Sequence, residues 1–450
     1  MGLKDAGTQK TTKRAYPEEG GRHASGATHG TESPAGTERR MEAIVERANL
    51  LAALKRVKEN GGAPGIDKMT VEALPLYLKE AWPELKAQLL EGRYRPCAVR
   101  RVEVEKPGGG KRKLGIPTAV DRFIQQAILQ VLQRDWDATF SEQSYGFRPG
   151  RSAHQAVEQA QRYIQEGYGV VVDIDLEAFF DRVNHDKLMG RVAKRETDKR
   201  LLRLVRAYLN AGVMENGVVV RTEEGMPQGG PLSPLLSNLL LDDLDKELER
   251  RGHRFVRYAD DCNIYVKTER AGERVMEGMR TFLEKKLKLK VNEGKSAVGP
   301  PSKRKFLGFT FTRDKQARIH LAPRTVERFK ERIRELTRRS WGVGFERRLK
   351  ELGQYLRGWR GYFKLCQTSK LLRDLDSWVR RRLRAALWQE WRTSRRRYRA
   401  LRNLGLKSDL AYSVVRSCHG PWRLSKTESL HRALNNKWFT RMGLPSIAEK

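Results

Sequence analysis

Two short apolar segments flank a pair of acidic residues, Asp260 and Asp261. Phe255 and Val256 precede the pair, and the run Ile-Tyr-Val at 264–266 follows it. Aromatic and β-branched residues favour strands, so the pattern predicts a β-hairpin whose bend carries both carboxylates. A turn can direct both side chains towards one place, which a straight strand cannot do. Such a pair favours a cation such as Mg²⁺ between the carboxylates; a solvent-exposed polar turn is the alternative.

A second acidic segment follows a run of valines. The residues Gly169–Ile174 predict a buried strand, and Asp173 and Asp175 share one of its faces because strand side chains alternate. A single unpaired carboxylate at the end of a buried strand costs free energy, because it loses hydration. A metal ion shared with Asp260 and Asp261 would offset that cost.

Strict alternation over residues 99–106, a glycine-rich turn and a second run over 111–117 predict another hairpin. It is basic, and its cations are Arg100, Lys106, Lys111 and Arg112. Arginine can bind phosphate through two parallel hydrogen bonds, so the hairpin suits a triphosphate. A solvated basic hairpin is the alternative.

Helices and loops connect these strands. Apolar spacing predicts helices over 71–91, 121–137 and 271–287, further strands over 289–292 and 305–311, and helices from 322 onwards. Ser233 is the expected N-cap of a helix that extends to about residue 251, with Pro234 as its first helical residue.

Two loops carry further candidate contacts. Residues 144–152 interleave aromatic residues with Arg148 and Arg151, a composition that suits nucleic acid, with an ordinary loop as the alternative. The glycine-rich loop 225–234 places Gln228 at its apex, where it could contact a substrate. The alternative is that the glycines only form the turn that precedes the helix.

Charge narrows the choice of partner. The 450 residues include 90 Lys and Arg against 55 Asp and Glu, a formal net charge of +35. Nucleic acid is the usual partner of such a surface, and an anionic membrane is the alternative. The chain contains neither a long apolar run nor a signal-peptide core, so we expect a cytoplasmic protein without a membrane span. Four scattered cysteines favour neither a disulfide framework nor a zinc site.

Arginine is concentrated in the helical C-terminal part. An apolar stripe there contains Trp378, Leu383, Leu387 and Trp391. We expect the arginines off that stripe to bind nucleic acid, because few acids offset them; a solvated face is the alternative. They are Arg380, Arg381, Arg382, Arg384, Arg395, Arg396 and Arg397.

The motifs described above, taken in their order along the chain, resemble those of a bacterial group II intron-encoded reverse transcriptase and maturase, close to the compact group IIC type. The acidic hairpin matches the family's Tyr-Ala-Asp-Asp box, and Asp175–Phe180 matches its first catalytic block. The loop 226–234 matches the Pro-Gln-Gly block. Gly-Phe-Arg-Pro-Gly-Arg and Leu-Gly-Ile-Pro-Thr blocks are also present. The resemblance covers about residues 41–450.

The resemblance implies an α+β right-hand polymerase with antiparallel sheets. Fingers and palm would occupy 41–312, an all-helical thumb or maturase (X) domain 313–400, and a small basic DNA-binding segment 401–450. Residues 1–40, which lack periodicity, predict a disordered tail. The family's DNA endonuclease domain has no counterpart in this sequence, so we do not expect second-strand cleavage by this chain.

The resemblance also implies roles for single residues. Asp175, Asp260 and Asp261 would hold two Mg²⁺ ions, with Asp173 in support. Phe180 would crowd the sugar 2′-position. The remaining nucleotide contacts would come from Arg100, Lys106, Arg112 and Gln228.

The implied function is an RNA-directed DNA polymerase that binds its intron RNA, assists splicing and copies the intron into DNA during retrohoming. Its partners would be the intron RNA, a DNA target and primer, and deoxynucleoside triphosphates, with no membrane involved. It would associate with the nucleoid during integration. A non-catalytic splicing factor and a domesticated reverse transcriptase for defence or repair are the alternatives.

Overall fold

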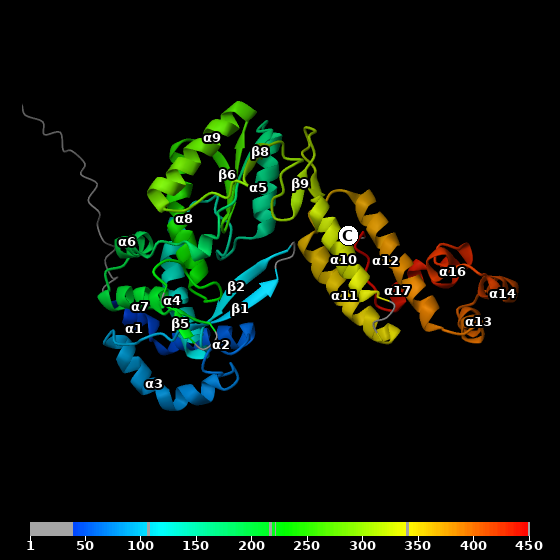
Figure 1. Ribbon diagram of the computed structural model, residues 1–450, viewed down its shortest axis with the longest axis horizontal. Coiled ribbons are helices and arrows are strands. Elements are labelled where there is room, and N and C mark those ends of the chain that lie inside the picture. The colour runs from blue at the N-terminus through cyan, green and yellow to red at the C-terminus, as the bar shows by residue number, and fades with distance from the viewer. Residues whose placement is uncertain (1–38, 106–108, 216–217, 221, 339–341, 449–450) are drawn as a thin grey trace, which may run out of the picture.

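Two groups of secondary-structure elements follow one another along the chain (Figure 1). The computed structural model describes residues 39–105, 109–215, 218–220, 222–338 and 342–448. The first group, blue to green in Figure 1, mixes helices with two four-stranded sheets. The second group, yellow to red, is helical, and a short hairpin lies between them. The expected α+β class with a helical C-terminal region is confirmed.

The helices of the first group surround its sheets. They are α1 (Arg40–Ile44), α2 (Arg47–Asn60), α3 (Leu74–Leu90), α4 (Ala119–Trp136), α5 (Ala153–Gln165), α6 (His185–Arg195), α7 (Lys199–Asn210), α8 (Ser233–Arg250) and α9 (Glu269–Phe282). The helices expected at 71–91 and 121–137 are therefore confirmed as α3 and α4. The helix expected at 271–287 is α9 followed by a π-helical turn over Leu283–Leu287.

The strands form two larger sheets and one hairpin. They are β1 (Val99–Glu105), β2 (Lys111–Ile116), β3 (Val170–Ile174), β4 (Val213–Glu215), β5 (Val218–Val220), β6 (Arg254–Tyr258), β7 (Asp261–Val266), β8 (Ala297–Gly299), β9 (Phe309–Phe311) and β10 (Ile319–Leu321). One sheet has the order β6-β7-β3-β8 and is antiparallel throughout. The other has the order β2-β1-β4-β5. Both expected hairpins, β1–β2 and β6–β7, are confirmed.

Two expected strands differ from the structure. Residues 289–292 make only an isolated bridge between Val291 and Leu176. Only the second half of 305–311 is a strand, because Leu307 and Gly308 adopt positive φ and form a turn. The sequence analysis missed β10, which pairs with β9 across the boundary expected at residue 312.

Two expected boundaries also need correction. Ser233 is the first residue of α8 and not its N-cap, which is Leu232. The Ser233 hydroxyl donates to the carbonyl oxygen of Pro227 (2.8 Å), so it fixes the preceding loop to the helix. The tail expected at 1–40 lies outside the described residues except at its end, where Arg40 begins α1 and pairs with Glu196 (2.9 Å).

The central strands β3 and β7 separate two apolar cores. Alternate residues such as Val172 and Ile264 join a core with the helices of the first group. Their neighbours Val171 and Tyr265 join a second core, which continues into the helical C-terminal group. Burial of each such aliphatic side chain contributes about 1.5–3 kcal/mol relative to exposure. The sheet therefore has a fixed register, because a one-residue slip would exchange the two faces.

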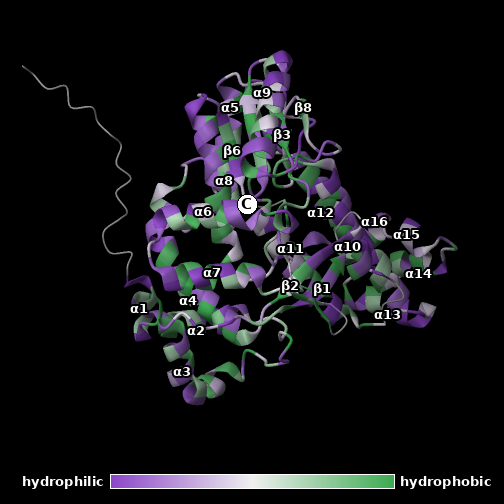
Figure 2. Ribbon diagram, turned by 60° about the vertical axis from the view of Figure 1, so that its left-hand side comes forward, coloured by the Kyte–Doolittle hydropathy of each residue, from purple (hydrophilic) through white to green (hydrophobic). Residues whose placement is uncertain are grey.

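The second group is a set of helices around the continuation of that core. They are α10 (Pro323–Leu336), α11 (Phe345–Tyr362), α12 (Ser369–Glu390), α13 (Ser394–Asn403), α14 (Ser408–Arg416), α15 (Pro421–Leu424), α16 (Glu428–Ala433) and α17 (Asn436–Arg441). Figure 2 shows that hydrophilic and hydrophobic residues are interspersed along these helices. Among the residues described, no helix combines the length and apolar character needed to cross a bilayer.

Candidate active site

The register of β3 and β7 brings the acidic residues to one face of the sheet. Asp173 pairs with Asn263, and Ile174 pairs with Cys262. Continuing this antiparallel register by one step places Asp175 level with Asp261. Since strand side chains alternate, Asp173, Asp175 and Asp261 share the face opposite to the Cys262 side chain.

The β6–β7 turn presents the second pair of carboxylates. Tyr258 pairs with Asp261, so Ala259 and Asp260 form the two-residue bend. Ala259 has a φ of 59°, a conformation that costs a non-glycine residue about 1–2 kcal/mol. The loop before α5 packs closely against it, and a Cβ on Gly146 would lie 2.3 Å from the Ala259 amide nitrogen. Only glycine fits at that position.

A fully buried arginine fixes this turn from beneath. Arg257 donates to both carboxylate oxygens of Asp245 on α8, at 2.7 and 2.5 Å. It also donates to Asn238 Oδ1 (3.0 Å), Ser144 Oγ (2.8 Å) and the carbonyl oxygen of Ala259 (2.9 Å). All the donor nitrogens of the guanidinium therefore have partners, and α8, the 144 loop and the acidic turn are joined through one side chain.

The acidic residues interact with one another electrostatically. Burial raises the pKa of Asp261 to about 8, and the neighbouring carboxylates of Asp173 and Asp260 add to the rise. Asp260 lies at the exposed tip of the turn, but loss of hydration around its carboxylate still raises its pKa, with Asp175 adding to the effect. The site therefore holds more negative charge than its surroundings neutralise.

Two cations lie close to these carboxylates. The ammonium group of Lys295 is 3.4 Å from Asp175 Oδ1, and the Asp175 backbone amide donates to Ser296 Oγ (2.9 Å). Arg112 is exposed on β2, and its charge opposes the rise in the pKa of Asp260. The nucleotide contact that the resemblance implies for Arg112 stays a prediction.

The donor set suits a hard divalent cation. Carboxylate oxygens are the ligands that Mg²⁺ prefers, and the raised pKa values mark charge that a cation would neutralise. Over the described ranges, no three His, Cys, Asp or Glu side chains are already gathered into a metal-binding cluster. Mg²⁺ commonly takes only one or two carboxylates and completes its shell with water and substrate phosphates, so a preformed cage is not required.

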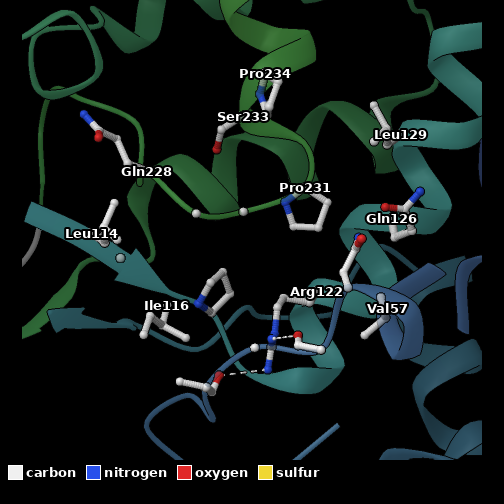
Figure 3. Close-up of a pocket in the computed structure, with 18 of the residues that line it drawn as sticks. Val57, Leu114, Ile116, Arg122, Gln126, Leu129, Gln228, Pro231, Ser233 and Pro234 are labelled. Carbon is white, nitrogen blue, oxygen red and sulfur yellow. Dashed lines mark hydrogen bonds between the residues drawn. The ribbon is translucent and has the colours of Figure 1, made fainter. Parts of the chain in front are cut away.

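A cavity of about 630 Å³ lies between the end of α2, strand β2, helix α4 and the loop that precedes α8 (Figure 3). Phe180 and Gln228, both expected at a nucleotide site, line it together with Phe147, Arg122 and Gln126. Arg122 is held by the carbonyl groups of residues 61 and 63, as the dashed lines in Figure 3 show. The structure thus brings the two expected pocket residues into one cavity.

The loop that carries Gln228 is fixed on both sides. The amide of Gly115 on β2 donates to the Gln228 carbonyl oxygen (2.8 Å), and the amide of Met226 donates to that of Phe180 (2.6 Å). Gly229 has a φ of 135°, and a Cβ there would lie 2.6 Å from the Gly115 carbonyl oxygen. These contacts hold Gln228 and Phe180 in a fixed relation.

The other expected contacts around this site have mixed outcomes. Arg100 donates to the carbonyl oxygen of Pro64 (3.0 Å) and does not line the cavity. Lys106 lies outside the described residues. Arg148, expected to bind nucleic acid, is instead buried and hydrogen-bonded to Asp137 and to backbone carbonyl groups. Arg151 pairs with Glu142 and is only partly exposed.

The arginines of α12 do not form the expected exposed face. Arg380 and Arg384 are 6% and 2% exposed, and both contribute to internal contacts. Arg381 lies 3.8 Å from the ring centre of Trp422, and Arg382 donates to Thr337 Oγ1 (2.6 Å). The helix packs against other elements on more than one side, which its amphipathic pattern could not reveal.

Helix α13 fits the expectation better. Arg395 and Arg396 are exposed, whereas Arg397 lies over the ring of Trp388 and is partly covered. An exposed pair of cations on one helix is the arrangement that phosphate contacts require.

Sequence reasoning missed the network under the acidic turn. The available signal was Arg257 itself, a charged residue within a strand whose neighbours Phe255 and Val256 are both buried. Asp245 and Asn238 lie on the polar positions of α8 and gave no signal, because they become buried only when α8 packs against β6.

Both groups of secondary-structure elements match models of known protein families. Residues 104–311 match the family model described as "Reverse transcriptase (RNA-dependent DNA polymerase)". Residues 326–405 match that described as "Group II intron, maturase-specific domain". The two matches follow the division between the mixed and the helical groups.

Individual proteins are also similar to this chain. The Escherichia coli (strain K12) protein YkfC is 31% identical over 313 residues, which cover 60% of this chain and 82% of YkfC. The group II intron-encoded protein LtrA of Lactococcus lactis subsp. cremoris is 29% identical over 299 residues, covering 52% of this chain and 50% of LtrA. This chain thus spans half the length of LtrA. A solved Cas6-RT-Cas1–Cas2 complex is 26% identical, with a TM-score of 0.36, over 54% of this chain and 42% of that chain.

Proposed function

This chain belongs to the family of group II intron-encoded reverse transcriptases and maturases, and on that premise we propose that Asp175, Asp260 and Asp261 are its catalytic residues for RNA-directed DNA polymerisation. The observation that carries the proposal is the convergence of β3 and the β6–β7 turn. It brings carboxylates near one another, and burial, with a further contribution from their mutual repulsion, raises the pKa values of Asp260 and Asp261. A structural role alone would not favour such an arrangement.

The three carboxylates would hold two Mg²⁺ ions. Bound there, the metal supplies Lewis-acid activation of the primer 3′-hydroxyl and neutralises charge on the leaving pyrophosphate. The protein's own part is positional: Arg257 fixes the turn, and Lys295 beside Asp175 limits local repulsion before substrate arrives. Asp173 lies on the same face in support.

The neighbouring cavity would take the incoming deoxynucleoside triphosphate. Phe180 would limit the space available beside the sugar, and Gln228, which lines the same cavity, would supply a polar contact. Arg112 and Arg100 lie on the β1–β2 hairpin and would approach the triphosphate. Lys106, which lies outside the described residues, would be a further triphosphate contact.

The C-terminal region would bind the intron RNA and assist its splicing, and the polymerase would then copy the intron into DNA at a target site during retrohoming. We propose fingers and palm over 41–312, thumb or maturase domain over 313–400 and a DNA-binding segment over 401–450. The exposed Arg395 and Arg396 support a nucleic-acid surface on α13.

Replacement of Asp260 by Asn tests the catalytic assignment. The substitution keeps the size of the side chain and removes the charge, so Mg²⁺-dependent primer extension on an RNA template should fall by about 10³-fold or more while RNA binding is retained. Asp186→Asn, on the exposed side of α6, is the matched control and should extend normally. Extension by Asp260→Asn at the rate of the control would contradict the assignment.

A further inference from the structure

A second cavity, of about 470 Å³, lies in the helical group between α12 and the C-terminal segment. Its lining is basic and polar, and comes from Arg373, Asp376, Ser377, Arg380, Arg384, His431, Asn436, Ser446 and Ala448. The lining therefore contains three arginines and one aspartate. Figure 1 shows α17, in red, beside α12, in orange, and both helices contribute residues to the lining.

The single carboxylate is already engaged by the protein. Asp376 accepts from Arg380 Nη1 (2.7 Å), from Ser446 Oγ (2.6 Å) and from the backbone amide of Ile447 (3.1 Å). It neutralises one guanidinium and anchors the C-terminal segment. No second acidic side chain in the lining neutralises the remaining positive charge of the cavity.

Two buried guanidiniums, Arg380 and Arg384, lie side by side on α12, and of the two only Arg380 is paired with a carboxylate. Arg380 and Arg384 are one helical turn apart, so their like charges repel. Nε of Arg384 donates to the Leu434 carbonyl oxygen (2.9 Å), and its Nη1 is hydrogen-bonded to His431 Nε2 (3.2 Å). Nε of Arg380 is buried without a hydrogen-bond partner. Burial, and then Arg380, lower the pKa of Arg384 to about 10. Buried cations of this kind are costly unless an anion accompanies them.

We propose that this cavity is a binding site for a phosphate group, supplied either by a nucleic-acid backbone or by free phosphate. Arginine forks match the geometry of phosphate oxygens, and Arg373 reaches the cavity from its exposed rim. The Ser377 hydroxyl and Asn436 amide add neutral donors at the same rim. The bound phosphate would offset the repulsion between Arg380 and Arg384 and strengthen the docking of residues 431–448 on α12.

Ser377 offers a test that leaves the buried arginines in place. It is exposed and lines the cavity, so Ser377→Asp introduces a carboxylate that competes with phosphate at no packing cost. Ser413→Asp, exposed on α14 away from the cavity, is the matched control. Thermal unfolding of the full chain is measured while potassium phosphate replaces potassium chloride at constant ionic strength.

We expect the unfolding midpoint of the wild type and of Ser413→Asp to rise saturably, by about 2 °C or more. Ser377→Asp should show no phosphate-dependent rise. Asp260→Asn should respond like the wild type, which separates this site from the polymerase assignment. A flat response of the wild type, or an equal rise in Ser377→Asp, would overturn the proposal.

The source of the phosphate follows from a second measurement. The salt dependence of RNA binding is compared for the wild type, Ser377→Asp and Arg373→Gln, with Arg250→Gln, an exposed arginine of α8, as the control. For a backbone phosphate, each cavity variant should reduce the slope of log K against log salt by about 1, and inorganic phosphate should compete with RNA. Unchanged slopes together with lost phosphate stabilisation would identify free phosphate as the ligand.

Discussion

The guanidinium of Arg257 donates a 2.9 Å hydrogen bond to the carbonyl oxygen of Ala259, the residue that turns the chain at positive φ immediately before Asp260. The same guanidinium is paired with Asp245 in the interior. The conformation of the acidic turn is therefore coupled to a buried ion pair on α8. This makes Arg257 a positioning residue, since it bonds the backbone of the turn and none of its hydrogen bonds reaches the carboxylates of the proposed metal ligands.

Two variants can separate positioning from stability. Arg257→Met alone should destabilise the protein by about 3–5 kcal/mol, because Asp245 is left buried without its partner. Arg257→Met combined with Asp245→Leu removes both charges, so its unfolding free energy should return towards that of the wild type. We expect its kcat for primer extension to stay about 10-fold or more below wild type, with a smaller change in the KM for nucleotide. Full recovery of kcat in the double variant would assign Arg257 a purely structural role.

Phe180 should control the choice of sugar. Phe180→Val opens the cavity wall beside the sugar, so incorporation of ribonucleotides relative to deoxynucleotides should rise by about 10-fold or more in single-nucleotide extension. Phe147→Leu provides the control, because Phe147 lines the same cavity but is exposed at its rim, and leucine adds no β-branch at its positive φ. An equal rise in both variants would indicate general widening of the pocket in place of a sugar gate.

The raised pKa of Asp261 predicts how the metal-free protein responds to pH. Its carboxyl keeps a proton up to about pH 8 in the native state, whereas the unfolded chain releases that proton near pH 4. The native state therefore binds more protons in between, and the free energy of unfolding should fall as pH rises from about 4 to 8.

Asp261→Asn removes this group. In EDTA at pH 8 the variant should exceed the wild type in stability by on the order of 1 kcal/mol, a value discounted because the carboxylate is partly exposed. Chemical denaturation across the pH range measures the difference. Added Mg²⁺ should stabilise the wild type more than the variant, and a pH slope shared by both proteins would contradict the assignment.

The arginines of the helical region should divide into two classes. Arg384→Gln removes a buried guanidinium that bonds Leu434, so we expect a loss of about 1–3 kcal/mol in the free energy of unfolding. The double change Arg395→Gln and Arg396→Gln affects exposed side chains and should leave stability within about 0.5 kcal/mol. It should weaken intron RNA binding and reduce the salt slope by about 2. RNA binding and splicing at wild-type levels would show that α13 is a solvated surface only.

Local patterns in the sequence predicted most of the palm. Alternation around Asp260 and the valine run before Asp175 predicted β6, β7 and β3, because strands with one or two buried faces have a strong apolar signature. The pairing of β3 with β7 was not available from alternation, since it joins residues about 90 positions apart. The ordered set of motifs supplied that expectation instead.

The arginines show where pattern reasoning failed. Arg148, Arg380 and Arg384 are chemically indistinguishable from surface arginines in a sequence, yet all three are buried in the folded chain. Arg148 is hydrogen-bonded to residues 137–144, whereas Arg384 contacts a segment distant along the chain. Arg384, for example, bonds a carbonyl group 50 positions later. Helical periodicity reports one apolar face, and a helix that is covered on several sides places its polar residues inside as well.

The position of β3 also affects how the protein is made. Val172 pairs on one edge with Ile264 and on the other with Val298, so both neighbours of β3 are synthesised much later than β3 itself. A nascent chain that ends before β7 leaves both edges of a valine-rich strand open to other chains. Asp175 and Asp261 cannot become neighbours until β7 has left the ribosome, so a polymerase truncated before that strand is inert and exposed to aggregation.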